Sequence, residues 1–143
     1  MAHWIFRCNT DWFDLDGRVR ASDKVGSWRV NRHKKDIHAG DAAFIWRTQK
    51  PKKPGGILAV CSVDSGPKEM ADVAGDLPFV IEHADDGNKC QVMITYKAIV
   101  WVPEDAIKAA LPDLSIFQRP WDGTNFDVTL KDAAVILKMA RKA

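Results

Sequence analysis

Cysteine is scarce in this 143-residue chain, and the pattern of its three cysteines argues against two kinds of site. Cys8, Cys61 and Cys90 are odd in number, lie far apart and form no Cys-x-x-Cys pair, so neither a disulfide framework nor a structural zinc site is expected. The four histidines show no metal-ligand spacing either. The sequence therefore predicts a protein without a bound metal or cofactor.

Long apolar runs are absent as well. No uninterrupted apolar segment approaches the roughly 20 residues that a membrane-spanning helix needs. At the N-terminus, Arg7 and Cys8 come before an apolar signal region can form. We therefore expect a cytoplasmic protein that does not enter a membrane.

Sequence motifs of catalysis are missing too. The chain has no Gly-x-Ser-x-Gly, no glycine-rich phosphate loop and no zinc-deaminase signature. The acidic pairs Asp85-Asp86 and Glu104-Asp105 fall in a predicted turn and at a predicted helix start, where solvation and the helix dipole explain them. We expect a protein that is not an enzyme. A Cys/His pair that converges from distant positions is the alternative.

Positive charge is unevenly distributed along the chain. Residues 28–53 contain eight of the 21 Lys and Arg but only two of the 19 Asp and Glu, a local balance of +6 against −4 for the rest. Two of the six tryptophans, Trp28 and Trp46, lie in this segment. A cationic segment with interleaved aromatic residues suits a polyanion whose bases can stack, which makes nucleic acid the leading partner. The alternative is a solvated loop beside two core tryptophans.

The hydrophobic pattern predicts mainly β-structure. Strands are expected where apolar residues alternate or form short runs, and turn residues separate them. The expected strands are His3–Cys8, Ala42–Arg47, Ile57–Val63, Leu77–His83 and Cys90–Val102. A turn over Pro51–Gly56 joins two of them as a hairpin, and a turn over Ala84–Lys89 joins two others.

Helices are expected at fewer places. Asn31 is a candidate cap for a short helix up to Ile37, and Asp11–Asp16 suits a single helical turn, with loop at Ala21–Gly26. Pro103 opens a later helix that Pro112 ends. The last helix has Thr129 as its cap and is expected to bury four residues. These are Leu130, Ala133, Ala134 and Leu137.

The expected elements amount to one α+β domain. With 46% hydrophobic residues the chain can build one real core, and no linker or internal repeat divides it. The sequence predicts a single domain over residues 1–143, with two or three helices against a curved core of about five to six strands. Such a sheet favours closure into a small β-barrel.

Several segments in this order resemble the EVE domain, a family of the PUA-like superfamily related to YTH domains. The similarity spans essentially the whole chain. It is carried by Trp28, Ile37–Asp41, Phe44–Thr48, Gly56-Ile57, Ile116–Pro120, Gly123–Phe126 and Thr129. The resemblance implies a PUA-like β-barrel with flanking helices. It also implies a reader of nucleic acid, in related domains often of a modified base held in an aromatic cage.

The resemblance also implies site residues. Trp28 matches the position that supplies a cage wall in YTH-like domains, and Trp46 matches an aromatic position in the central strand. Many relatives carry another tryptophan before the strand that begins at Cys90, where this chain has Asn88-Lys89. Trp12 or Trp121 would have to supply that wall. The further base-binding candidates are Asn31, Arg47, Thr48, Gln118 and Arg119, and the phosphate-binding candidates are Arg29, Arg32, Lys34 and Lys35.

Together these observations predict a non-catalytic RNA- or DNA-binding module with a base pocket walled by Trp28 and bordered by Trp46. Trp28→Ala is then expected to weaken oligonucleotide binding without a large change in melting temperature. Two alternatives remain open at this point. One is a binder of a nucleoside or other small molecule that uses the same pocket, and the other is an accessory subunit of an RNA-modifying enzyme. The sequence does not fix the oligomeric state.

Overall fold

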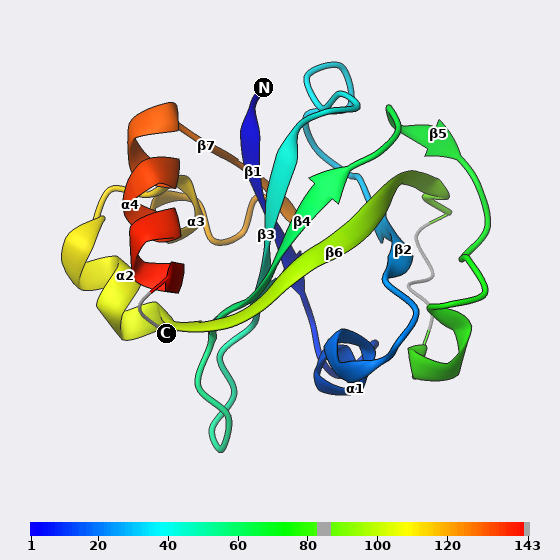
Figure 1. Cartoon of the computed structure of the whole chain (residues 1–143), viewed down its shortest axis with the longest axis horizontal. Coiled ribbons are helices and arrows are strands. Elements are labelled where there is room, and N and C mark those ends of the chain that lie inside the picture. Colours follow the sequence, from blue (N-terminus) through cyan, green and yellow to red (C-terminus); the bar gives the residue numbers. More distant parts are fainter. Residues whose placement is uncertain (83–86, 142–143) are drawn as a thin grey trace.

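The computed structural model describes residues 1–82 and 87–141. The strands are β1 (His3–Cys8), β2 (Val25–Arg29), β3 (Ala42–Arg47), β4 (Gly56–Val63), β5 (Lys68–Glu69), β6 (Cys90–Pro103) and β7 (Asn125–Val128). The helices are α1 (Leu15–Arg20), α2 (Glu104–Ala110), α3 (Ser115–Gln118) and α4 (Leu130–Arg141), with a 3-10 helix η1 (Leu77–Phe79). Figure 1 shows their arrangement.

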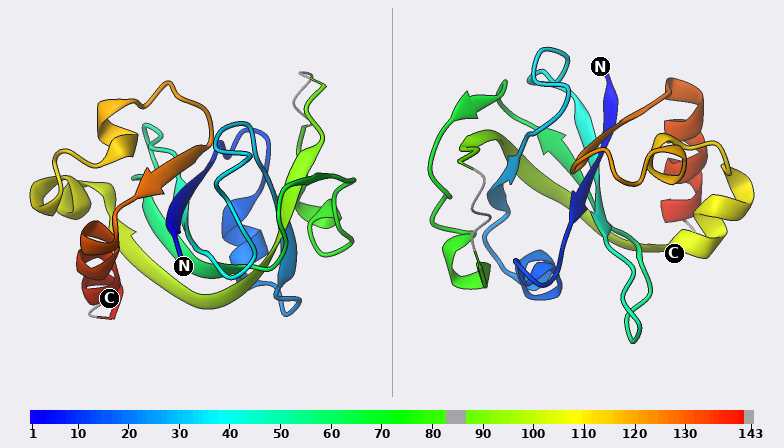
Figure 2. Two further views of the ribbon diagram at one scale, coloured as in Figure 1. Left: turned by 90° about the horizontal axis from the view of Figure 1, so that it is seen from above. Right: turned by 180° about the vertical axis from the view of Figure 1, so that it is seen from behind.

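All strands belong to one mixed, strongly curved sheet. Its order is β2-β6-β4-β3-β1-β7, and β5 pairs with β6 next to this path. β1 and β3 are parallel, and the other pairs are antiparallel. The pairing of β4 with the long β6 is irregular at two places, and such irregularities increase the bend of a strand. Figure 2 shows β6 bent into an arc.

The curled sheet confirms the predicted fold class, an α+β protein with a small mixed β-core and flanking helices, as a half-barrel. Within the described residues, β2 and β7 stand at the two ends of the strand order. Between β2 and β7, hydrogen bonds from side chains take the place of backbone pairing. This seam is the part of the fold that builds the candidate site.

Two hydrophobic clusters fill the two sides of the sheet. The cluster on the α1 side contains Phe6, Trp28 and Tyr96, and the cluster on the α2–α4 side contains Phe44 and Trp46. Figures 1 and 2 show α2, α3 and α4 gathered on one side and α1 with β2 on the other. Because neighbouring residues of a strand face opposite sides, a shift of one position decides which cluster a tryptophan enters.

Four of the expected strands are confirmed, and one is wrong. Leu77–Phe79 is the 3-10 helix η1, with Pro78 in its first turn, and Val80 makes only an isolated bridge to Phe13. A Pro in a run of apolar residues is a signal against a strand, because it lacks the N–H of the ladder. Residues 83–86, which cover the end of that strand and the first half of the following turn, lie outside the described residues.

One expected loop and one expected helix are corrected. β2 begins at Val25, so the expected loop Ala21–Gly26 ends earlier and its last residues pair with β6. The short helix expected from Asn31 to Ile37 is replaced by turns. The reason is that the Asn31 side chain accepts hydrogen bonds from Thr124 in place of capping a helix.

The helix ends follow local chemistry. Thr129 caps α4 as expected, with its Oγ1 accepting from the N–H of Asp132 at 3.1 Å. The expected buried face is partly wrong, because Leu130 and Ala134 are exposed and Ile136 is buried with Ala133. The helical turn expected at Asp11–Asp16 lies further along as α1, where Asp14 accepts from Gly17 N–H.

The described residues hold no helix that is both long and apolar enough to span a bilayer. Within the same part of the chain, no three His, Cys, Asp or Glu side chains are arranged to hold a metal ion. The three cysteines are free, and burial raises the pKa of Cys8 to about 12. The cytoplasmic location stays a prediction.

Candidate functional site

A cavity of about 170 Å³ lies beside the seam, lined by the end of β1, by β2 and by Thr124, which precedes β7. One side is formed by the end of β1 and the segment that follows it, with Trp12 and Phe13. The other side is formed by Ser27–Arg29 of β2, Gln91 of β6 and residues around η1. The cavity is therefore assembled from segments that are far apart in the sequence.

Aromatic rings form part of this cavity. Trp28 lines it while its ring stacks on Phe6, with centroids 6.2 Å apart and planes 18° apart, and meets Phe13 edge-on. Trp28 is only 7% exposed, whereas Trp12, which also lines the cavity, is 43% exposed. Trp121 is 77% exposed and is not part of the lining. Of the two tryptophans considered for a second wall, the structure brings Trp12 to Trp28.

Trp46 lies elsewhere, contrary to the expectation that it borders the pocket. Its side chain is 1% exposed and meets Phe117 edge-on at 5.7 Å. β3 is an interior strand of the sheet, and the strand pleat turns Trp46 toward the helices α2–α4. Trp46 is therefore part of the core.

Arg47 and Thr48 are also committed to the scaffold. Arg47 donates to Asp16 at 2.8 Å and to the Pro54 carbonyl at 2.7 Å, and its guanidinium lies over Trp101. Thr48 donates to the Cys8 carbonyl at 2.8 Å. Neither residue lines the cavity, so the structure separates them from Trp28.

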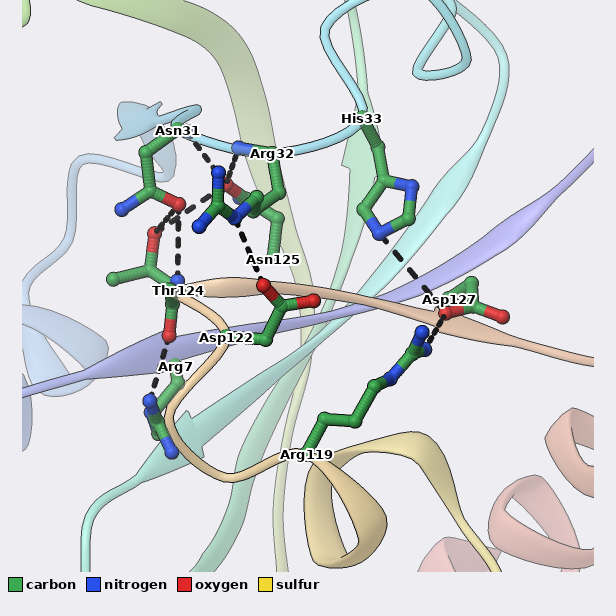
Figure 3. A network of polar contacts seen from close by, with 10 residues as sticks. Arg7, Asn31, Arg32, His33, Arg119, Asp122, Thr124, Asn125 and Asp127 are labelled. Carbon is green, nitrogen blue, oxygen red and sulfur yellow. Dashed lines mark hydrogen bonds and ion pairs between the residues drawn. The ribbon is translucent and has the colours of Figure 1, made fainter.

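Gln118 and Arg119 form part of a different depression, of about 250 Å³, beside α3, β7 and the start of α4. Gln118 donates to the Pro112 carbonyl, and Arg119 donates to Asp127 at 3.0 Å. Figure 3 shows Arg119 pointing to Asp127, away from Arg7. These two candidates are not brought to the cavity.

The seam itself is closed by two asparagines (Figure 3). Asn125 is fully buried; its Oδ1 accepts from Asn31 N–H at 2.8 Å and its Nδ2 donates to the Arg29 carbonyl at 3.0 Å. In return, Asn31 Oδ1 accepts from the N–H and hydroxyl of Thr124. Asn31 thus holds the cavity wall, since Thr124 is part of the lining.

Glycine is required in this seam at one position. Gly123 has φ of 85°, in the left-handed region that favours glycine, and a Cβ atom there would lie 2.5 Å from Asn31 Oδ1. Its carbonyl accepts from Arg7 at 2.6 Å. Any larger residue would push the Thr124 loop away from the seam.

The phosphate-binding candidates surround this seam. Arg29 lines the cavity and donates to the Asn88 carbonyl, and Arg32 pairs with Asp122 at 2.9 Å. Lys34 and Lys35 are exposed in the turns that follow, and among the described residues no carboxylate lies within ion-pair distance of them. The four cations therefore extend from the cavity outward along one segment.

Sequence reasoning missed two features of the cavity. Arg7 lines it with its guanidinium over Phe126, and burial lowers the pKa of Arg7 from its ordinary value. Three carboxylates also line it, those of Asp72, Asp76 and Glu82. An isolated Arg in a strand and acidic residues in a loop carry no sequence signal, because only the fold brings them together.

Comparisons with known proteins agree on the fold. The sequence matches the family model described as EVE domain over residues 2–139. The human THYN1 protein, solved in complex with DNA containing 5-methylcytosine, is similar with a TM-score of 0.71 and 13% identity, covering 100% of this chain and 99% of that one. The structure of Rpa0253 from Rhodopseudomonas palustris has a TM-score of 0.68 and 20% identity, covering 99% and 94%.

A more distant likeness links the fold to YTH domains. The YTH domain of the MRB1 protein of Zygosaccharomyces rouxii, solved with RNA containing N6-methyladenosine, has a TM-score of 0.55 and 11% identity, covering 97% of this chain and 87% of that one. No protein with a curated description matches the sequence. These likenesses confirm the PUA-like fold, and the family match over nearly the whole sequence shows that the chain belongs to the EVE domain family.

Proposed function

We propose that this protein is a non-catalytic nucleic-acid-binding module that holds one base, in its natural target a modified base, in the cavity beside Trp28. The observation that carries the proposal is a cavity of about 170 Å³ with two tryptophans in its lining, one of them exposed. A cavity of roughly 150 Å³ accommodates benzene. The cavity therefore has room for one planar ring, while the rest of a nucleotide stays outside.

The energetics favour a base that is already unstacked. Extruding a base from a duplex costs a few kcal/mol, and stacking on an aromatic side chain returns roughly 1–3 kcal/mol per base. Because Trp12 is partly exposed at the cavity, an entering ring can cover its free surface. Single-stranded nucleic acid avoids most of the extrusion cost and is the better first ligand to test.

The backbone phosphates belong outside the cavity, along the segment that leaves β2. Arg32, Lys34 and Lys35 are exposed there, next to the cavity residue Arg29. Phosphate contacts of this kind position a strand without reading its sequence, and they weaken as salt concentration rises. Recognition of the base is then left to the cavity.

The solved neighbours support this assignment. Two of them were solved with nucleic acid that contains a methylated base, 5-methylcytosine in DNA for THYN1 and N6-methyladenosine in RNA for the YTH domain. The same fold therefore accompanies contact with both kinds of nucleic acid. We extend this role to the present chain because its cavity lies at Trp28.

The test compares two exposed tryptophans. Trp12→Ala removes an indole from the cavity, and Trp121→Ala removes one that is not part of its lining. Single-stranded oligonucleotides with one methylated or unmethylated cytosine or adenine are titrated against each variant by fluorescence anisotropy. We expect Trp12→Ala to weaken binding about tenfold, as the loss of one stacking contact predicts. Trp121→Ala is expected to stay within about twofold of the parent protein.

Trp28→Ala is a poorer test than the sequence suggested. Because Trp28 is 7% exposed and stacked on Phe6, we expect its truncation to lower stability by about 3–5 kcal/mol, so the melting temperature will fall. Equal effects of Trp12→Ala and Trp121→Ala would contradict the proposal. Tight, salt-independent binding of a free nucleoside without binding of any oligonucleotide would instead establish a small-molecule binder.

A further inference from the structure

One wall of the cavity consists of groups that accept hydrogen bonds. Asp76 lies in this wall and is 4% exposed. Its Oδ1 accepts from Arg18 Nε at 2.7 Å, and its own N–H donates to the Val73 carbonyl at 3.0 Å. The Arg18 guanidinium is fully buried, so the ion pair keeps the Asp76 carboxylate in place. With its N–H used, Asp76 has only acceptor atoms to offer a guest.

Ser27 lies beside Asp76 in the same wall and directs both of its hydrogens toward it. The backbone N–H of Ser27 donates to Asp76 Oδ2 at 2.9 Å, and the hydroxyl donates to the same oxygen at 3.0 Å. A serine hydroxyl has one hydrogen and two lone pairs. Toward a guest, Ser27 can therefore act only as an acceptor, through the lone pairs of Oγ.

Gln91 extends this acceptor wall. Its Nε2 donates to the Met70 carbonyl at 3.2 Å and to Asp72 Oδ1 at 3.1 Å. Because both partners can only accept, the amide nitrogen must face them. The remaining group of the amide is Oε1, which can accept a hydrogen bond from a guest. Asp72 and Glu82 add two more carboxylates to the lining.

Two arginines line the cavity as well. Arg7 comes from β1, and Arg29 comes from β2, the strand that also carries Ser27. An anionic group seated against Asp76 and Asp72 would meet carboxylates, so a phosphate is disfavoured inside this wall. A neutral ring that donates hydrogens to the acceptors and accepts hydrogens from the arginines is complementary to both.

We propose that the acceptor wall of Ser27, Asp76 and Gln91 determines specificity, and that it favours a base with an exocyclic amino group. Cytosine donates from its amino group at the position where uracil and thymine carry a carbonyl oxygen. Adenine and guanine also carry such a group. Against this wall a carbonyl oxygen faces other acceptors, and a buried polar group left without a partner is strongly unfavourable. The inference rests on the proposed function.

The first experiment uses matched bases in one sequence context. Short oligothymidines carry a single variable base at the centre, either cytosine or uracil in one pair and adenine or unsubstituted purine in the other. Each pair differs in the amino group. We expect the amino-bearing member to bind at least about tenfold more tightly in both pairs, as expected for hydrogen bonds that only it can make. Equal affinities within both pairs overturn the inference while leaving the proposed function intact, whereas no binding to any of the four overturns the proposed function.

The second experiment tests the residues through this preference. Ser27→Ala removes one acceptor, and Gln91→Met removes another with little change in shape. Ser62→Ala is the matched control, because Ser62 likewise donates to an aspartate, Asp64 at 2.8 Å, but does not line the cavity. We expect the preference for the amino-bearing base to fall at least about threefold in the first two variants and to stay constant in the control.

A destabilised protein loses affinity for all four oligonucleotides in the same proportion, so the ratio within each pair separates specificity from folding. If Ser27→Ala does not fold, Gln91→Met provides the same readout from a different strand. Unchanged ratios in both variants would show that the acceptor wall does not select the base.

Discussion

The two basic stretches of this chain look alike in the sequence and differ in the structure. The first follows β2 and contains Arg29, Arg32, Lys34 and Lys35; the second spans the β3–β4 hairpin and contains Arg47, Lys50, Lys52 and Lys53. In the second, three of the four cations pair with carboxylates, those of Asp11, which precedes α1, and Asp16, in the first turn of α1. In the first, Arg32 pairs with Asp122, whereas Lys34 and Lys35 lie beyond ion-pair distance of any carboxylate among the described residues.

This difference separates two uses of positive charge. The first stretch reaches the cavity through Arg29 and is held by the neutral side chain of Asn125, and its Arg32, Lys34 and Lys35 are exposed. The second stretch stabilises the hairpin, since its charges are matched in the fold. A sum of charges over the sequence counts both stretches equally, but the candidate phosphate surface contains only the first.

The largest expected effect concerns the attachment of the first stretch. Asn125 is fully buried and bonds the Arg29 carbonyl and the Asn31 N–H. Its replacement by Ala leaves both groups without partners, so we expect the free energy of unfolding to fall by about 3 kcal/mol. Urea denaturation measures this change. A loss below about 1 kcal/mol would mean that water or a shifted loop replaces the asparagine, and that the seam is not rigid.

The next effect concerns the second stretch. Arg47 is 9% exposed and joins Asp16, the Pro54 carbonyl and the Trp101 ring. We expect Arg47→Ala to lower the free energy of unfolding by about 2 kcal/mol, with unchanged oligonucleotide affinity in the folded fraction. Denaturation and anisotropy on the same sample check the two parts. A large loss of affinity at full folding would place Arg47 in the binding surface.

The charge pairing of the second stretch also predicts a dependence on pH. Burial opposes ionisation of Asp16, but hydrogen bonds from Lys53 and Arg47 outweigh it and lower the pKa of Asp16 below its ordinary value of 3.8. A lowered folded-state pKa contributes stability that is present above the unfolded pKa and is lost as pH falls through the folded one. The stability difference between the parent protein and Asp16→Asn should therefore shrink as pH is lowered from neutral to below 3.8. A constant difference across that range would contradict the pairing.

The smallest effect concerns the pair of Arg32 with Asp122 in the first stretch. Arg32 is exposed and paired with Asp122, so a phosphate must compete with this carboxylate for the guanidinium. We expect Asp122→Asn to tighten oligonucleotide binding about two- to threefold at low salt, and to do so less at high salt. Asp113→Asn, on the Gln118 side, is the matched control. Weaker binding of Asp122→Asn would show that Asp122 supports the surface.

Much of the fold could be predicted from the sequence because its strands carry their own signals. The runs at His3–Cys8, Ala42–Arg47 and Cys90–Val102 are apolar enough to be strands in any context, and Thr129 has the chemistry of a helix cap. β2 was harder, since Gly26 and Ser27 are poor strand formers and pair only because β6 lies next to them. The strand predicted from Leu77 was wrong because the apolar residues indicate a strand, whereas Pro78 disfavours one.

The candidate site was less predictable, because a cavity depends on which side of a strand a residue faces. Trp28 and Trp46 have similar neighbours in the sequence, yet one lines the cavity and the other packs under the helices. The roles of Asn125 and Asp76 depend on partners 96 and 49 residues away. No local pattern encodes such a distance.

The salt dependence of binding tests the contrast between the two stretches most directly. Two triple variants are compared with the parent protein on one single-stranded oligonucleotide, the first with Arg32, Lys34 and Lys35 changed to Ala and the second with Lys50, Lys52 and Lys53 changed to Ala. Each phosphate contact on a single strand contributes about 0.7 to the slope of log K against log salt. The account predicts that the first variant loses up to about 2 units of slope and the second keeps the parent slope. A loss of slope in the second variant with none in the first would contradict it.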